Sequence, residues 1–171
     1  HEKLPRRCVM LEHQTMQGET FTFQAMPGPL AAALPAEIPE VKHAARMTWT
    51  GQYLFRVGDK SGYEKGIFVE PSFFQIFTFP ALKGDPEAAL RDAGSCVLTE
   101  QAARKYFGDA DPVGQIIRYN NEHDLKVGAV IKDVPEASSI RFDVLLPFRR
   151  YALANPGQID SWNTNSFPTW I

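Results

Sequence analysis

Residues 95–135 read SCVLTEQAARKYFGDADPVGQIIRYNNEHDLKVGAVIKDVP, and the local signals in this stretch agree with one another unusually well. Residues 95–98 form a short apolar segment, which is typical of a buried strand. Thr99 is a good helix N-cap, because its hydroxyl can accept a hydrogen bond from the first turn. Gly108 is placed to end the helix, since glycine adopts the positive φ of a C-terminal cap. We therefore predict a strand followed by a helix over residues 99–107.

A β-hairpin is predicted for the second half of this stretch. Pro112 cannot continue the helix, because proline lacks an amide donor and its ring clashes with the preceding turn. Residues 115–119 and 124–132 have strand character and are separated by a polar turn at 120–123. Strict alternation in the second strand predicts one buried face made of Leu125, Val127, Ala129 and Ile131. If the helix packs on this hairpin, we expect Phe107 to be buried against Val127 or Ile131, with Gly108 left-handed.

The other segments give simpler expectations. Strands are predicted at residues 8–11, 20–23, 41–50 and 140–146, and a hairpin at 51–70. Helices are predicted to start at Pro29, which suits the first helical position, and after Asp85, which precedes Pro86. Residues 149–171 are polar, and we expect them to be irregular.

Five short motifs follow one another between residues 66 and 148. They are PSFFQIF (71–77, with GD at 84–85), ARKYFG (103–108), DPVG (111–114), VGAVIKDVP (127–135) and DVLLPF (143–148). Each motif is weak alone, but together and in this order they resemble the MacB-like periplasmic core domain. That domain is found in FtsX-like permeases of ABC transporters.

The resemblance implies an α+β fold in two parts. One part is a small β-α-β (Porter-like) subdomain built from both ends of the segment, and the other is an inserted mixed (Sabre-like) subdomain of strands and short helices. By that pattern residues 1–49 are the first half of the terminal subdomain and residues 50–148 the insertion. Residues 149–171 are the return segment, in which residues 161–162 and 169–171 resemble the start of the second terminal strand. The second β-α-β half is missing, so we expect an incomplete subdomain with an exposed sheet edge.

The resemblance also implies a function without catalysis. In the family, ATP hydrolysis in the cytoplasm closes a permease dimer, and this motion reaches the periplasmic domains. The implied partners are a second permease copy, a cytoplasmic ATP-binding subunit or domain, and a periplasmic adaptor or exported substrate. The expected location is the periplasmic side of an inner-membrane protein of efflux or export type.

Composition restricts the other classes. The chain has 171 residues, of which 44% are hydrophobic and 22% charged, as in an ordinary folded domain with a core. A net charge of −2 gives no long-range attraction to nucleic acid. No apolar run approaches the roughly 18 residues that a membrane-spanning helix needs. Because the chain begins with His1 and ends at an apolar Ile171, we expect it to be part of a longer protein.

No residue pattern indicates an enzyme, a metal or a cofactor. The four histidines have no metal-ligand spacing, and neither a P-loop nor a nucleophile elbow is present. Asp109 and Asp111 fit a solvated turn better than a calcium loop. Cys8 and Cys96 are predicted as two buried free thiols, with a structural disulfide as the alternative.

One constellation has an open functional interpretation, an aromatic cluster made of Phe73, Phe74, Phe77 and Phe79. Exposed aromatic side chains mark interfaces, so this cluster is a candidate partner surface. The simpler interpretation, which we favour, is that the rings fill the core.

Two other functions compete with the permease. A free-standing periplasmic binding module would equally lack catalytic groups, whereas a hydrolase would need a titratable cluster for which the sequence has no candidate. Apolar segments of about 20 residues on both flanks would support the permease.

Overall fold

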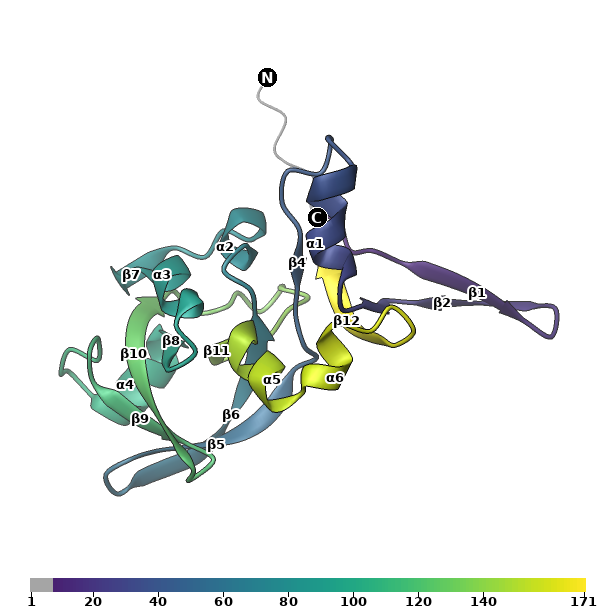
Figure 1. Cartoon of the computed structure of the whole chain (residues 1–171). Coiled ribbons are helices and arrows are strands. Elements are labelled where there is room, and N and C mark those ends of the chain that lie inside the picture. Colours follow the sequence, from purple (N-terminus) through teal and green to yellow (C-terminus); the bar gives the residue numbers. More distant parts are fainter. Residues whose placement is uncertain (1–7) are drawn as a thin grey trace.

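The computed structural model describes residues 8–171 as three β-sheets and six short helices (Figure 1). The largest sheet contains β5 (Gly51–Val57), β6 (Lys60–Val69), β7 (Ala81–Gly84), β8 (Ser95–Thr99), β9 (Ile116–Tyr119), β10 (His123–Ile131) and β11 (Val144–Pro147). A second sheet contains β3 (Ala25–Pro27), β12 (Asn165–Trp170) and β4 (Ala45–Arg46), and a two-stranded ribbon contains β1 (Glu12–Met16) and β2 (Glu19–Phe23). The helices are α1 (Leu30–Glu37), α2 (Phe73–Ile76), α3 (Pro86–Arg91), α4 (Glu100–Phe107), α5 (Phe148–Ala154) and α6 (Pro156–Ile159). The mixed α+β class expected from the sequence is confirmed.

Six strands of the large sheet close into a ring. Their order is β10-β8-β11-β6-β5-β9, and β9 completes the ring because it pairs with both β5 and β10. Tyr119 of β9 lies opposite Phe55 of β5, while Ile117 lies opposite Leu125 of β10. β7 adds to the outside of the ring on the remaining part of the β10 edge. Because the ring is closed, the edge N–H and C=O groups of its strands find partners within it. An open sheet must protect such edges in other ways.

Two layers of core lie on the two faces of these strands. The inner layer takes a fully or nearly fully buried side chain from every strand of the ring: Phe55, Phe68, Leu98, Ile117, Leu125 and Leu146. The outer layer takes their neighbours Ile67, Val97 and Leu145, with Phe73 of α2 and Leu90 of α3. Each such fully buried side chain contributes roughly 1.5–3 kcal/mol to the free energy of unfolding.

The strand–helix–hairpin unit predicted at residues 95–135 is confirmed. The Thr99 hydroxyl accepts a hydrogen bond from the Ala102 amide at 3.3 Å, so it caps α4. β9 and β10 pair in antiparallel register, from His123 opposite Tyr119 onward. Gly108 ends the helix with φ of 59° and ψ of −126°. Its φ is positive as expected, but this ψ lies outside the left-handed helical region that we predicted.

The predicted single buried face of β10 is wrong. Its register against β8 shifts between Val127 and Ala129, which reverses the alternation at Gly128. Leu125 and Val127 therefore belong to the inner layer, whereas Ala129 and Ile131 belong to the outer one. The glycine is needed here because a Cβ atom at this position would lie 2.5 Å from the Cβ of Ala89 on α3. A β-bulge is a local feature that strict alternation cannot reveal.

The buried aromatic residue of α4 is Tyr106 rather than Phe107. Phe107 is only half-buried against the inner layer, which includes Val127. Tyr106 is 2% exposed, and its hydroxyl donates to Glu64 Oε1 at 2.7 Å. Lys105 pairs with the same carboxylate, which is buried on β6. This pair of contacts fixes α4 to the ring.

Several predicted boundaries are also wrong. The strand predicted at 41–50 contracts to the two residues of β4, and the strand predicted at 140–146 begins only at Val144. In the segment predicted at 8–11 only Val9 forms a bridge, to Trp170. Residues 149–171 are not irregular, because they contain most of α5, all of α6 and β12. β12 carries a proline and polar residues of low strand propensity, so its pairing with β3 and β4 overrides propensity.

We predict that Tyr106→Phe destabilises the domain. The substitution removes a hydrogen bond to a buried carboxylate, and such a loss costs about 1–3 kcal/mol of unfolding free energy. Urea unfolding measures the effect. Arg104→Gln on the same helix is the control, because its ion pair with Glu100 is exposed and contributes about 0.5 kcal/mol or less. Equal stability of the Tyr106→Phe chain and the parent would contradict the prediction.

Candidate functional site

The four phenylalanines of the aromatic cluster lie around α2. Phe73 and Phe77 are 1% and 8% exposed, and both belong to the outer core layer. Phe74 and Phe79 are half-buried, with their ring centroids 5.5 and 5.7 Å from that of Phe73. Core packing therefore accounts for Phe73 and Phe77, while a partner-facing role for the exposed edges of Phe74 and Phe79 stays a prediction.

A hollow of about 680 Å³ lies beside this cluster. Phe77 and Phe79 line it together with Trp170 of β12 and Ile140. The Phe77 and Trp170 rings meet edge to face at 5.1 Å. The indole N–H of Trp170 is buried and has no hydrogen-bond partner within residues 8–171. Polar side chains, among them Lys132, Asp133 and Ser138, also line the hollow, and the Trp170 N–H is buried rather than exposed to it.

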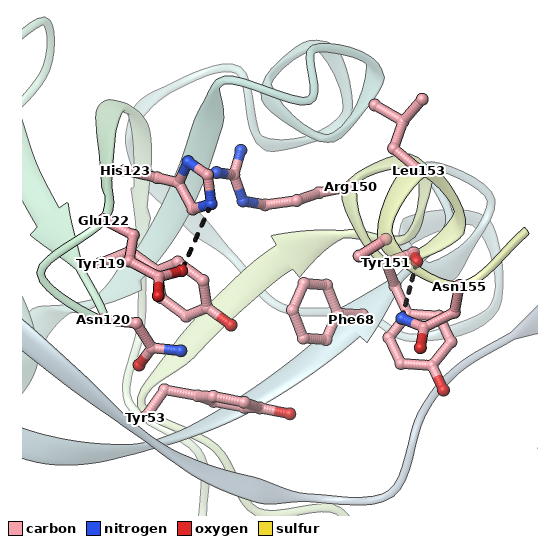
Figure 2. A pocket seen from close by; sticks show the side chains of 11 residues that line it. Tyr53, Phe68, Tyr119, Asn120, Glu122, His123, Arg150, Tyr151, Leu153 and Asn155 are labelled. Carbon is pink, nitrogen blue, oxygen red and sulfur yellow. Dashed lines mark hydrogen bonds and ion pairs between the residues drawn. The ribbon is translucent and has the colours of Figure 1, made fainter.

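A second pocket, which sequence reasoning did not find, lies between the β9–β10 turn and α5 (Figure 2). Its volume is about 610 Å³, within the range of small-molecule sites. Four aromatic rings form its base, and polar groups from the turn and from α5 surround them. The lining residues are Tyr53, Phe68, Tyr119, Asn120, Glu122, His123, Arg150, Tyr151, Leu153, Ala154 and Asn155.

The four rings are in contact with one another. Tyr53 meets Phe68 edge to face with ring centroids 5.6 Å apart, and it meets Tyr119 at 5.7 Å. Phe68 in turn lies 5.5 Å from Tyr151. These rings come from β5, β6, β9 and α5, so closure of the ring of strands brings them together. We call this set the aromatic base.

Arg150 supplies the permanent positive charge of the pocket. Its guanidinium carbon lies 5.6 Å from the centroid of the Tyr119 ring, and its Nη1 donates to the Ala93 carbonyl at 2.9 Å. No carboxylate of residues 8–171 lies within 4.0 Å of this guanidinium. Glu122, the acidic group of the pocket, instead lies 3.8 Å from His123 at the solvent-exposed rim (Figure 2).

Two tyrosines of the aromatic base, Tyr53 and Tyr119, are neutral hydrogen-bonding groups. Burial raises the pKa of Tyr119 to about 12, and the neighbouring Tyr53 phenol adds to the rise. Burial also raises the pKa of Tyr53 above its ordinary value, with a smaller contribution from Tyr151. At neutral pH these phenols remain protonated, so each can donate a hydrogen bond to a ligand oxygen. The arrangement can bind and orient a molecule.

Both cysteines are free thiols, and they differ in exposure to solvent. Cys96 is buried in the inner layer, and its burial raises the pKa of the thiol to about 12. Cys8 is exposed, so the expectation that it is buried is wrong. A thiol with a raised pKa is a poor nucleophile, which leaves Cys96 as a packing residue. Within the part of the chain that the structure describes, no three His, Cys, Asp or Glu side chains gather to hold a metal ion.

The helices of residues 8–171 are short, and none has the length and apolar character needed to cross a bilayer. A family model for the MacB-like periplasmic core domain matches residues 6–166. The chain belongs to this family. The MacB-like domain is therefore the periplasmic domain of an ABC transporter permease, as the motifs around α4 suggested. The family comprises membrane permeases that work with an ATPase, and its periplasmic domains are generally non-catalytic.

Solved structures resemble the MacB-like domain along most of its length. A domain of a protein described as a permease from Porphyromonas gingivalis has a TM-score of 0.84 and 30% identity, covering 96% of this chain and 71% of that one. The periplasmic region of MacB from Actinobacillus actinomycetemcomitans has a TM-score of 0.63 and 15% identity, covering 85% of this chain and 64% of that one. The extracellular domain of the noncanonic ABC-type transporter YknZ from Gram-positive bacteria has a TM-score of 0.60 and 15% identity, covering 85% and 79%. Among curated proteins, a search finds no match.

We predict that the MacB-like domain loses stability at alkaline pH through Tyr119. Its pKa is near 10 in the unfolded chain and about 12 in the folded one. The contribution is therefore fully present below pH 10 and is lost as the pH rises toward 12, because the unfolded chain ionises first. Urea unfolding from about pH 8 to about pH 12 should show this decline, and Tyr119→Phe should reduce it.

The control is Tyr63→Phe, since the Tyr63 side chain is 68% exposed. Its pH profile should match that of the parent. A Tyr119→Phe profile with the full alkaline decline would contradict the prediction.

Proposed function

We propose that this domain transmits the ATP-driven motion of a permease dimer to a periplasmic substrate or partner. Membership of the MacB-like family supports a periplasmic, non-catalytic part of a transporter. The observation that carries the proposal is a set of contacts that joins the three-stranded sheet to the ring of strands. A second permease copy, a cytoplasmic ATP-binding subunit or domain, and a periplasmic adaptor or exported substrate are the proposed partners.

Residues 8 and 171 lie side by side at one edge of the three-stranded sheet. The Cys8 amide donates to the Ile171 carbonyl at 3.0 Å, and the Ile171 amide donates back to Cys8 at 3.0 Å. The Met10 amide continues this pairing with the Thr169 carbonyl at 2.9 Å. A displacement of either segment therefore reaches the same three-stranded sheet.

Arg46 connects that sheet with the ring. Its Nε donates to Glu70 Oε1 at 2.9 Å, and its backbone amide donates to Oε2 of the same carboxylate at 3.0 Å. Glu70 directly follows β6, while Arg46 is in β4. The guanidinium also donates to the Gly28 carbonyl at 2.6 Å and lies 4.6 Å from the centroid of the Phe148 ring. One half-buried side chain thus contacts both sheets and α5.

The backbone reinforces the same connection. Met47 forms an isolated bridge with Val69, and the Thr48 amide donates to the Phe68 carbonyl at 3.0 Å. The Thr48 hydroxyl accepts from the Phe68 amide at 3.1 Å. Because β4 runs directly into this pairing with β6, a shift of the three-stranded sheet is passed to the ring.

We predict that Glu70→Gln in the full-length permease impairs transport-linked function while leaving ATP binding intact. The amide retains the shape of the side chain but removes the charge that holds Arg46. Because this ion pair is partly buried, removing the charge weakens it more than it would weaken an exposed pair. The expected result is at least a fivefold loss of transport with normal nucleotide affinity. Transport assays and nucleotide titration on the same membranes measure both.

The matched control is Arg118→Gln, which breaks the exposed ion pair with Asp124 on the β9–β10 hairpin. It should transport normally. Normal transport by Glu70→Gln, with the protein present at parental level, would refute a role of this connection in transmission.

A free-standing periplasmic binding module is the alternative function; membership of a permease family weighs against it, and the aromatic pocket is the one observation in its favour. The two candidates differ in what flanks the domain. Apolar segments of about 20 residues on both sides in the full protein sequence support the permease, and polar flanks support the module.

A further inference from the structure

We propose that the pocket between the β9–β10 turn and α5 binds a small aromatic anion, whose ring lies on the aromatic base and whose acidic group pairs with Arg150. This inference does not depend on the transmitting role proposed above. It concerns a site that the phenylalanine cluster does not touch, on the other side of the ring strands from α2.

The aromatic base defines the apolar half of the ligand. Tyr53, Phe68 and Tyr119 present connected ring surfaces at centroid spacings of 5.6 and 5.7 Å. Planar rings prefer offset or edge-to-face contacts with such surfaces, and these contacts add to the gain from burial. The volume of about 610 Å³ accepts two or three fused or linked rings.

Arg150 defines the charged half. An arginine has five N–H donors, and in residues 8–171 only the Nη1 bond to Ala93 accounts for any of them. That bond and the Tyr119 ring hold the guanidinium in place, so little rotamer freedom is lost when an anion binds. A planar guanidinium without a carboxylate partner matches a carboxylate or sulfonate, with which it forms paired hydrogen bonds.

The other charged groups of the pocket leave this preference intact. Glu122 has a side chain that is 73% exposed, so water screens its charge. His123 Nε2 lies 3.8 Å from Glu122 Oε2, and the His123 ring stacks on Tyr119 with the ring centroids 6.4 Å apart. In Figure 2 the His123 and Arg150 side chains are seen above the rings of Tyr53 and Phe68, and both contact the Tyr119 ring. All three side chains line the pocket, but the Glu122 carboxylate is within 4.0 Å of His123 and not of Arg150, so the guanidinium stays available to an anion.

The test uses two probes that share one skeleton. 1-Anilinonaphthalene-8-sulfonate carries an anion, and N-phenyl-1-naphthylamine is the same molecule without it. Fluorescence titration and calorimetry of the purified chain should give saturable binding of both, with tighter binding of the sulfonate. Arg150→Gln should lower the affinity for the sulfonate at least tenfold and change the affinity for the neutral probe less than twofold. Arg150→Lys, which keeps the charge, should retain the preference for the anion.

Two further variants separate the pocket from the rest of the surface. Ala154→Trp places a large side chain at an exposed lining position and should weaken both probes at least tenfold. Arg149→Gln removes the neighbouring exposed arginine, which does not line this pocket, and should change neither. Thermal unfolding shows whether each variant is folded. If Arg150→Gln does not fold, Ala154→Trp still tests the proposal. Unchanged affinity of both probes for Ala154→Trp, or of the sulfonate for a folded Arg150→Gln, would overturn the proposal.

Discussion

The double pairing of β9 is the constraint on which the rest of the domain depends. This four-residue strand joins β5 on one side and β10 on the other, so it turns an open sheet into a ring. The inner core layer exists because six strands surround it, and α4 covers it with Tyr106 held by Glu64. The aromatic pocket also follows from closure, since Tyr53 and Tyr119 meet only because β5 and β9 are neighbours.

The sequence predicted those elements whose structure depends on residues that are neighbours in the chain. Thr99, the apolar face of α4 and Gly108 lie within ten residues of one another, and the helix they specify is present. Prediction from the sequence failed where the structure depends on contacts between residues that are far apart in the chain. β12 is a strand because β3 and β4 flank it, and Arg150 reaches Tyr119 through the packing of α5. The aromatic pocket collects residues from position 53 to position 155, and no spacing along the chain could have indicated it.

α5 lies between the two regions on which the proposals rest, the connection at Arg46 and the aromatic pocket. Phe148, its first residue, packs on Phe167 of β12 at 5.2 Å and lies under the Arg46 guanidinium. Tyr151, one turn later, forms part of the aromatic base and lies 5.7 Å from the same Phe167 ring. A seven-residue helix therefore borders the three-stranded sheet on one side and the pocket on the other. Phe68 is shared in the same way, since its backbone pairs with Thr48 and its ring belongs to the aromatic base.

The antiparallel pairing of residues 8–10 with 169–171 gives the domain an unequal response to force. Pulling residues 8 and 171 apart loads the hydrogen bonds in succession, first the two between Cys8 and Ile171 and then the bond from Met10 to Thr169, so the pairing opens stepwise. Pulling both ends in the same direction instead loads β12 in shear against β3 and β4, where several hydrogen bonds share the tension. These contacts thus resist a concerted pull on residues 8 and 171 more strongly than a pull that separates the two residues.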